Sequence, residues 1–242
     1  MTGTVFPPAR WILRPPDTER AASLAGGLTL SLPAAQVLLH RGLVDPASAD
    51  RFLRADLEDL SDPALLLDLP RAAARILQAV QRDERIIVYG DYDADGVTAT
   101  AILVRGLRAL GGVVEFFIPR RQVEGYGLHA EAIARLGGPG LLIAADCGIS
   151  ATAEVALARA GDLDVIILDH HEPPPTLPPA LAVVGPKRVD QPPVTPFAAC
   201  GLAYQTVRAV WRLAGRTEEP EDLLDLAGLG TIADVVPLVG EN

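Results

Sequence analysis

Residues 86–100 read IIVYGDYDADGVTAT, and this stretch decides the fold. The apolar run Ile86–Tyr89 ends at Gly90 and predicts a buried strand, and the mixed apolar pattern of Val97–Leu110 predicts a helix. Three aspartates occupy alternate positions between them, namely Asp91, Asp93 and Asp95. A buried strand that ends in carboxylates and turns into a helix is typical of a functional site in an open α/β sheet.

These three carboxylates need a positive partner. Carboxylates this close repel one another by about 1 kcal/mol per near pair even in water. A divalent metal ion is the obvious candidate, because hard cations take oxygen ligands.

Strands and helices alternate on either side of this stretch. The apolar runs predict strands at Ile86–Tyr89, Val113–Ile118, Leu141–Ala145, Asp164–Leu168 and Leu181–Val184. The helical patterns cover Arg71–Glu84, Val97–Leu110, His129–Leu136, Ala151–Ala160, Leu202–Leu213 and Pro220–Leu229. This spacing predicts an α/β domain with a doubly wound, mainly parallel sheet and helices on both faces.

A helical lead precedes this domain. Helices are predicted at Leu32–Leu43 and Pro46–Leu57, with prolines between them and the sheet. We therefore expect a lead over 1–70 that packs on a core domain over 71–242. Because the sequence stops soon after Asp234 with no closing element, we also expect the chain to be a fragment.

Composition limits the function classes. The chain has 242 residues, 49% of them hydrophobic, which is enough for a sizeable core, and no apolar run reaches the length of a membrane span. The formal net charge of −10 argues against nucleic-acid binding, unless many acids are metal ligands. Its two cysteines, Cys147 and Cys200, lie in apolar surroundings, so we expect no structural disulfide and a cytoplasmic protein.

Further aspartate and histidine residues follow the other predicted strands. Asp146 follows Leu141–Ala145, the triplet Asp169-His170-His171 follows Asp164–Leu168, and Asp234 comes late in the chain. Asp146 alone could equally be a helix N-cap. Taken together, however, four segments deliver only Asp and His to one sheet edge, which suits Mn²⁺, Mg²⁺ or Zn²⁺, with oxygen ligands favouring the first two. So many ligands suggest two ions sharing a carboxylate, roughly 3.5–4 Å apart.

Four motifs carry a family resemblance. GDYDADG at 90–96, AADCG around Asp146, LDHHE around His170 and TIADVVPL around Asp234 resemble motifs one to four of the DHH phosphoesterase superfamily. The segment RRQVEGYGL (Arg120–Leu128), the segment ending GPK at Lys187 and the helical lead resemble the RecJ branch of single-strand-specific 5′→3′ exonucleases. The likeness runs from about Leu32 to the last residue.

The resemblance implies a role for each metal-ligand candidate. Asp93 and Asp95 would each bind one ion, and Asp146 would bridge both. His170 and Asp234 would bind the second ion. Asp91 would complete the shell of the first ion, directly or through water.

It also implies roles on the substrate side. His171 would face the scissile phosphate, and Asp169 would orient its neighbours; with Asp146 and His170 they form the catalytic set. Arg121 and the loop Glu124–Leu128, including Gly127, would shape a pocket for the terminal nucleotide. Within this loop Tyr126 either stacks on a base or simply packs.

Two departures from the family pattern concern the shape of that pocket. Gly185 stands before Pro186 where asparagine is usual, and Ala198 and Cys200 stand where serine or glycine is common. Neither removes a candidate ligand. The resemblance also implies a second domain and an OB-type DNA-binding domain, and neither is found in this sequence.

The resulting prediction is a metal-dependent exonuclease of DNA repair and recombination. It would use two Mn²⁺ or Mg²⁺ ions to release mononucleotides from the 5′ end of single-stranded DNA. The resemblance adds a single-strand-binding protein and a recombination helicase as partners, and a monomeric state. Two alternatives are a phosphodiesterase for short oligonucleotides or cyclic dinucleotides, and a non-catalytic module that binds metal or protein.

Overall fold

The computed structural model describes residues 10 and 12–242, which form two compact units meeting in sequence between Leu60 and Ser61. This division falls ten residues before the expected boundary at 70. The packing of the lead on the core domain stays a prediction.

The first unit is helical. It contains α1 (Thr18–Leu28), α2 (Leu32–His40), α3 (Pro46–Arg54) and the 3₁₀ turn η1 (Leu57–Asp59). Each α-helix begins at a side-chain cap, from Asp17, Ser31 and Asp45, that accepts a first-turn N–H. Their small core consists of Ala21, Leu24, Ala25, Ala35, Leu38 and Ala49.

Within the described residues, no single helix is long and apolar enough to cross a membrane. Only α1 and α2 taken together pass such a test, by length and composition alone, and they are bent by 112° at their junction.

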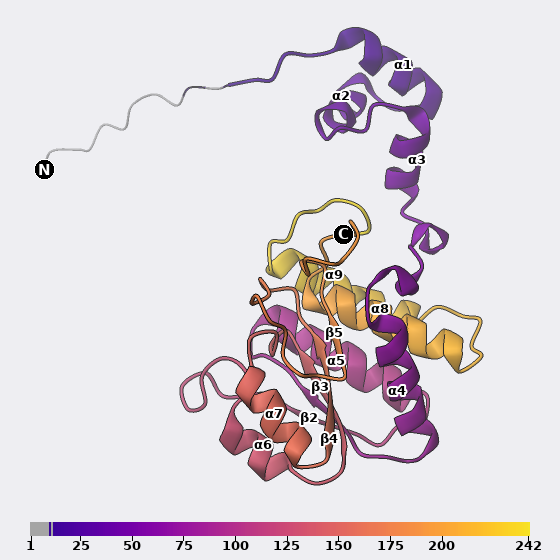
Figure 1. Ribbon diagram of the computed structural model, residues 1–242. Coiled ribbons are helices and arrows are strands. Elements are labelled where there is room, and N and C mark those ends of the chain that lie inside the picture. Colours follow the sequence, from indigo (N-terminus) through magenta and orange to yellow (C-terminus); the bar gives the residue numbers. More distant parts are fainter. Residues whose placement is uncertain (1–9, 11) are drawn as a thin grey trace, which may run out of the picture. The chain divides into compact units, whose positions relative to one another are not determined.

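The second unit is built on a five-stranded parallel sheet (Figure 1). Its strands are β1 (Ile86–Tyr89), β2 (Val114–Phe117), β3 (Gly140–Ala145), β4 (Leu163–Leu168) and β5 (Ala182–Val184). They lie in the order β2-β1-β3-β4-β5. Every residue of β1, β3 and β5 is buried, as expected for strands covered on both faces.

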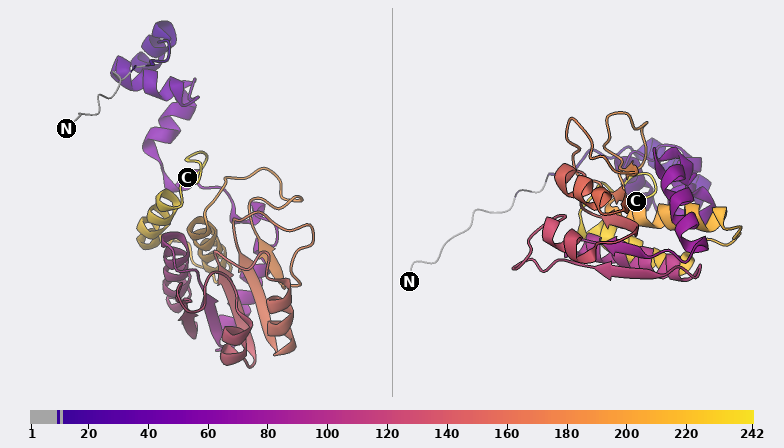
Figure 2. Two further views of the ribbon diagram at one scale, coloured as in Figure 1. Left: turned by 90° about the vertical axis from the view of Figure 1, so that its left-hand side faces the viewer. Right: turned by 60° about the horizontal axis from the view of Figure 1, so that its bottom comes forward.

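Helices cover both faces of this sheet (Figure 2). The helices α6 (Ala130–Leu136) and α7 (Thr152–Ala160) pack with Ile87, Leu142 and Val165 in one core cluster. A second layer consists of α4 (Leu69–Gln81), α5 (Ala94–Arg108), α8 (Ala199–Leu213) and α9 (Leu224–Ala233). In this layer α8 contacts the other three helices, and α4, α5 and α8 each contact strands of the sheet. Two 3₁₀ turns, η2 (Pro63–Leu65) and η3 (Glu221–Leu223), complete the unit. The predicted doubly wound α/β fold is confirmed.

Three helices begin earlier than the sequence predicted: α4 begins at Leu69 instead of Arg71, and the other two changes concern the candidate site. Helix α5 begins at Ala94 instead of Val97, because Asp93 caps it. Helix α8 begins at Ala199 instead of Leu202. Its first N–H groups are bonded by Asp95, so the cap comes from another part of the chain.

The strand order creates a switch point between β1 and β3. From β1 the chain passes to β2 on one side, and β3 then pairs on the other side of β1. The connections diverge there, at the carboxyl ends of the strands, which is where open α/β sheets bind their ligands. Asp91 follows β1 and Asp146 follows β3 at this position.

Candidate metal centre

The turn after β1 delivers two carboxylates. A Cβ on Gly96 would lie 2.7 Å from the backbone N and O of Asp91, so only glycine lets the chain fold back so tightly. Asp93 accepts the N–H of Gly96 at 2.9 Å as the N-cap of α5 and remains exposed. Asp91 is buried, and its Oδ1 has no hydrogen-bond partner.

Asp95 lies in the first turn of α5 and is 1% exposed. Its Oδ2 accepts the N–H of Ala199 at 2.7 Å, and its Oδ1 accepts the N–H of Cys200 at 2.8 Å. Both donors belong to the first turn of α8. This carboxylate is therefore held in one orientation by main-chain groups more than a hundred residues away in sequence.

Asp146 follows β3 in a left-handed conformation, with φ of 64°. It is 1% exposed, and its Oδ1 has no hydrogen-bond partner. Burial, and next the negative charges of Asp95, Asp93 and Asp169, raise its pKa to about 10. A cation bound here would remove that penalty.

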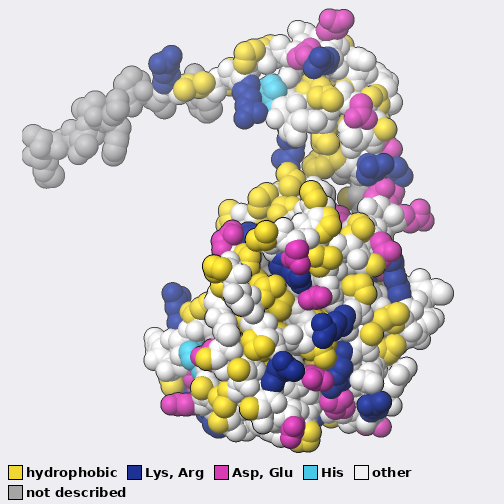
Figure 3. Space-filling model, in the orientation of Figure 1, with side chains coloured by type: hydrophobic (Ala, Val, Ile, Leu, Met, Phe, Trp, Pro, Cys, Tyr) yellow, Lys and Arg dark blue, Asp and Glu magenta, His cyan; other side chains and the backbone are white. Residues whose placement is uncertain are grey.

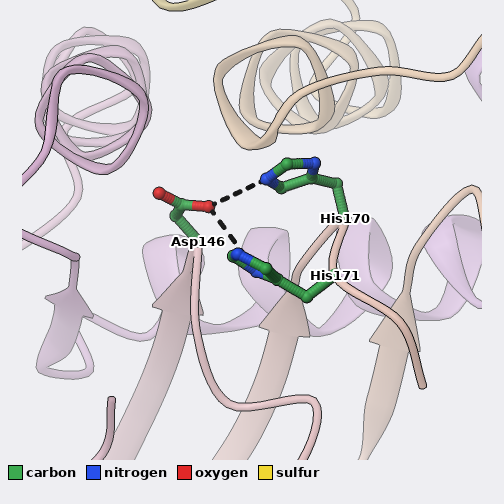
Figure 4. A group of neighbouring side chains, drawn as sticks. All are labelled: Asp146, His170 and His171. Carbon is green, nitrogen blue, oxygen red and sulfur yellow. Dashed lines mark ion pairs between the residues drawn. The ribbon is translucent and has the colours of Figure 1, made fainter. Parts of the chain in front are cut away.

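Two histidines face Asp146 from the end of β4 (Figure 4). The Nε2 of buried His170 lies 3.3 Å from Asp146 Oδ1, and the Nδ1 of His171 lies 4.0 Å from the same atom. The His171 ring is tilted against the His170 ring, with centroids 4.6 Å apart. Both rings therefore present nitrogen to one carboxylate oxygen.

Asp169 fixes His171. Its Oδ1 lies 2.7 Å from His171 Nδ1 and accepts the main-chain N–H of the same residue at 3.1 Å, while its Oδ2 accepts the N–H of Ile149 at 3.0 Å. Burial alone raises the pKa of Asp169, but these hydrogen bonds outweigh it and lower the pKa below its usual value. The hydrogen bond between Asp169 Oδ1 and His171 Nδ1 raises the pKa of His171. Asp169 is thus fully engaged in orienting its neighbour.

Asp234 reaches the site from the C-terminal end of α9. Its Oδ2 lies 3.6 Å from His170 Nε2. Burial, opposed by His170 and reinforced by Asp95 and Asp93, raises its pKa. The helix that carries it approaches closely at Gly230, where a Cβ would lie 2.4 Å from Thr98 Oγ1 and 2.6 Å from Cys200 Sγ.

These side chains form three groups of potential metal ligands. Within each group, the ligand atoms all lie within 4.8 Å of one another. The β1 group is Asp91, Asp93 and Asp146; the α9 group is Asp95, His170 and Asp234; the histidine group is Asp146, His170 and His171. Asp146 links the first group to the third, and His170 links the second to the third. All six metal-ligand candidates from the sequence therefore meet at one edge of the sheet.

The charge of this edge is not balanced by the protein. In the described part of the chain, no lysine or arginine lies within 4.0 Å of the five carboxylates of the β1 and α9 groups, and their only ion-pair partners at that range are the two histidines. Mixed carboxylate and imidazole donors without a resident cation suit Mn²⁺ or Mg²⁺, and oxygen donors dominate here. The residues present fit two ions that share Asp146.

The substrate-side candidates lie around this edge. Tyr126 is half exposed, and its hydroxyl lies 3.3 Å from both the main-chain O of Asp146 and His171 Nδ1. Its neighbour Gly127 has φ of +93°, a conformation that favours glycine. The main-chain O of Gly127 accepts a hydrogen bond from the hydroxyl of Tyr89 at 3.1 Å. Arg121 lies over the ring of Tyr92, 5.4 Å from its centroid, so it stands next to the aspartate turn but outside the ligand groups.

A hollow of about 340 Å³ occurs at the other end of α5, lined by Arg105, Arg108, Trp211 and Leu223. Arg108 donates to the carbonyl of Val114, and Trp211 donates to that of Gly106. Since these polar groups are already bonded within the protein, the hollow lacks the unpaired charge of the sheet edge.

The sheet and most of the site lie within the range that a protein-family model matches. The DHH family, N-terminal domain, matches residues 85–231. The chain belongs to the DHH family. The matched residues contain β1 to β5, α5, α8 and all of the ligand candidates except Asp234.

Relatives with sequence similarity along most of the chain are exonucleases by name. The chain is 43% identical to the single-stranded-DNA-specific exonuclease RecJ of Bacillus subtilis over 239 residues, covering 96% of this chain and 29% of that protein. It is 40% identical to RecJ of Thermus thermophilus over 243 residues, covering 96% and 34%. The chain thus spans about a third of the length of these relatives.

Solved structures give the same neighbours. RecJ in complex with Mn²⁺ from Thermus thermophilus superposes with a TM-score of 0.75 at 36% identity, covering 95% of this chain and 32% of that one. An exonuclease RecJ bound to manganese gives 0.69 at 43% identity, covering 74% and 46%.

The sequence did not reveal one part of the site, the main-chain amides of Ala199 and Cys200. The predicted helix began after them, and neither residue has a side chain that signals a site. The available signal was indirect: AACGLAY starts a helix without any capping side chain, so its N–H groups need an acceptor from elsewhere.

Proposed function

We propose that this chain is the catalytic part of a single-stranded-DNA-specific 5′→3′ exonuclease that uses two divalent ions, Mn²⁺ or Mg²⁺. One observation carries the proposal: three ligand groups, joined through Asp146 and His170, meet at the switch point of the sheet, and no lysine or arginine of the described residues pairs with their carboxylates. The similarity to exonucleases named for single-stranded DNA, at 40% and 43% identity, supports the substrate class.

The ligand assignment follows the three groups. We infer that Asp91, Asp93 and Asp146 hold one ion, and that Asp95, His170 and Asp234 hold the other, with Asp146 shared. When bound, such a pair supplies a water-derived nucleophile near neutral pH and stabilises the charge of a leaving oxygen.

His171 is assigned to the substrate phosphate. Its Nδ1 is engaged by Asp169 at 2.7 Å, so Nε2 is the nitrogen that remains for the substrate. Because the hydrogen bond to Asp169 raises the pKa of His171, the ring retains its proton to higher pH than a free histidine. A protonated Nε2 can donate to a non-bridging phosphate oxygen and stabilise the charge that develops there.

The substrate path is assigned to the loop before α6. Tyr126, beside His171, is half exposed and can stack on the terminal base, and Arg121 is an exposed cation that can bind a phosphate. The face of the second unit seen in Figure 3 intersperses basic and acidic side chains and gathers no broad basic patch. We therefore expect weak binding of DNA by this chain, with a shallow dependence on salt.

The remaining assignments rest on the same likeness. We propose a cytoplasmic, monomeric protein of DNA repair and recombination, with a helical lead over 1–70, a catalytic domain over 71–242, and a single-strand-binding protein and a recombination helicase as partners. Chromatography of the purified chain with each partner tests the last point directly.

The test is a nuclease assay of the full chain with Mn²⁺. Wild-type protein should release mononucleotides from the 5′ end of a long single strand, act poorly on a duplex of the same sequence and act poorly on a dinucleotide. Asp93→Ala and His170→Ala should each lower the rate by at least about 10²-fold, because even residues behind metal ligands contribute that much.

Matched substitutions far from the edge provide the control. Arg216→Ala removes an ion pair with Glu218, a hydrogen bond to the carbonyl of Ala109 and a contact with the Trp211 ring, none of which involves a ligand group, and should leave the rate unchanged. Unchanged rates for Asp93→Ala and His170→Ala would contradict the metal assignment. Preference for the dinucleotide over the long strand would instead favour a short-oligonucleotide phosphodiesterase.

A further inference from the structure

Helix α8 begins without a capping side chain of its own. Its N-cap residue, Ala198, is in an extended conformation, and alanine is among the poorest residues at that position. The start of this helix is buried, so its first N–H groups cannot turn to water. Asp95 of α5 supplies the missing acceptor, with bonds of 2.7 Å from Ala199 and 2.8 Å from Cys200.

This arrangement fixes both oxygens of Asp95. One N–H bonds each oxygen, so the carboxylate cannot rotate without breaking a buried hydrogen bond. A carboxylate has about four lone-pair sites, and therefore each oxygen keeps capacity for a cation. Its Oδ2 lies 3.7 Å from His170 Nε2, on the side where the other α9-group ligands are.

The same turn of α8 also seats the helix that carries Asp234. The Cys200 thiol donates to the carbonyl of Ala227 at 3.2 Å and lies 3.5 Å from Thr231 Oγ1. A Cβ on Gly230 would lie 2.6 Å from Cys200 Sγ, so α9 rests directly on this turn. One turn of α8 thus contacts the carboxylate of Asp95 and supports the helix of Asp234.

We propose that the first turn of α8 is the positioning element for the ion of the α9 group, an inference that rests on the proposed two-ion site. Its amides orient Asp95, and the Cys200 side chain sets the approach of Asp234. The β1 group does not depend on this turn, since Asp93 is bonded by Gly96 of its own helix and Asp91 Oδ1 has no hydrogen-bond partner. Disturbing the turn should therefore affect one ion and leave the other.

Ala199→Pro tests this selectivity. Proline is well tolerated at the first position of a helix, and Ala198, with ψ of 172°, already has the conformation that a following proline requires. The substitution removes the N–H that bonds Asp95 Oδ2. In Mn²⁺ titration calorimetry of the full chain, we expect one of two binding events to weaken about ten- to hundredfold and the other to stay within error.

Ala130→Pro is the matched control. Ala130 is the exposed first residue of α6, and its preceding residue His129 is also extended, with ψ of 130°. Both Mn²⁺ affinities should equal those of the wild type. Thermal unfolding and far-ultraviolet circular dichroism of both variants report whether the chain is folded before each titration.

An amide-to-ester replacement at position 199 serves if Ala199→Pro does not fold. It exchanges the N–H for oxygen and keeps the methyl side chain, so the same selective loss of one ion is expected. Two wild-type affinities in the altered protein, or equal weakening of both, would overturn the positioning role. Failure of the wild type to bind two Mn²⁺ ions would instead count against the proposed function itself.

Discussion

Two buried charged clusters of the second unit differ in how completely their charged groups are hydrogen-bonded. Arg208, in the middle of α8, is 1% exposed, and its guanidinium is saturated in the sense that every nitrogen donates a hydrogen bond: Nε and Nη2 to Glu219 at 2.7 and 3.1 Å, and Nη1 to Gln205 at 2.7 Å. At the sheet edge, Asp91 and Asp146 are also buried, yet each has an oxygen with no hydrogen-bond partner. A buried charge whose hydrogen bonds are all made within the protein serves the fold, whereas a buried carboxylate oxygen without a hydrogen bond can bind a ligand.

The largest effect should come from breaking the saturated cluster. Arg208→Met removes the partner of Gln205 and leaves Glu219 with Arg212 alone, and should lower the free energy of unfolding by about 3 kcal/mol. For a chain of this size, that corresponds to a fall in Tm of about 6–12 °C. Calorimetric melting measures it, and Mn²⁺ affinity of the folded variant should be unchanged.

Asp146→Asn should have the opposite sign on stability. Folding raises the pKa of Asp146 from 3.8 to about 10, so the folded state holds a proton that the unfolded state has released. The metal-free protein therefore loses stability as pH rises through that window. At about pH 8 the neutral amide should raise Tm by about 2–4 °C while lowering nuclease activity at least about 10²-fold.

Melting curves in a chelator between about pH 5 and about pH 9 check the sign. Wild-type Tm should fall across this range, and the Asp146→Asn variant should fall less. Addition of Mn²⁺ should raise wild-type Tm and leave the variant nearly unaffected. A wild-type Tm that rises with pH would show that Asp146 is not the dominant uncompensated group.

Asp169→Asn should move one titration. The carboxylate of Asp169 raises the pKa of His171, first by accepting a hydrogen bond from Nδ1 and further by its negative charge, so a neutral amide should lower that pKa toward the ordinary histidine value. Nuclear magnetic resonance of the His171 ring measures the shift. The Tm should change little beyond the cost of the bonds to Ile149 and His171.

The smallest effect is expected at Tyr126. Tyr126→Phe keeps the ring but removes the hydroxyl near Asp146 O and His171, and should lower kcat by about threefold to tenfold. Tyr126→Ala removes the ring as well. A further rise in KM for single-stranded DNA in the second variant alone would show base stacking, while equal KM values would show that the ring only packs.

Much of the site could be predicted from sequence because every ligand candidate except Asp234 comes soon after a recognisable strand. Ile86–Tyr89 is predicted with the bounds that the structure shows, since short apolar runs bounded by glycine and aspartate indicate buried strands. Parallel strands bring their carboxyl ends to one edge, so Asp146 and His170 could be placed together without knowing the strand order.

The first residues of α5 and α8 could not be predicted as well, because the spacing of apolar residues does not show which group caps a helix. Asp93 caps its own helix, but Asp95 caps a helix that begins 104 residues later, at Ala199. No local pattern records such a bond. The close approach of α9 at Gly230 is similar, since it depends on Cys200 and Thr98 in other helices.

The sequence by itself therefore determined the kind of fold and the residue types of the site. Apolar periodicity sets strands and helices, and the acidic and histidine residues stand at their ends. Tertiary structure alone decided the electrostatics: which buried carboxylates have an oxygen without a hydrogen-bond partner, as Asp91 and Asp146 do, and which are bonded by distant amides, as Asp95 is. The physical reason is that burial and hydrogen-bond partners depend on packing between elements far apart in sequence, which no single segment encodes.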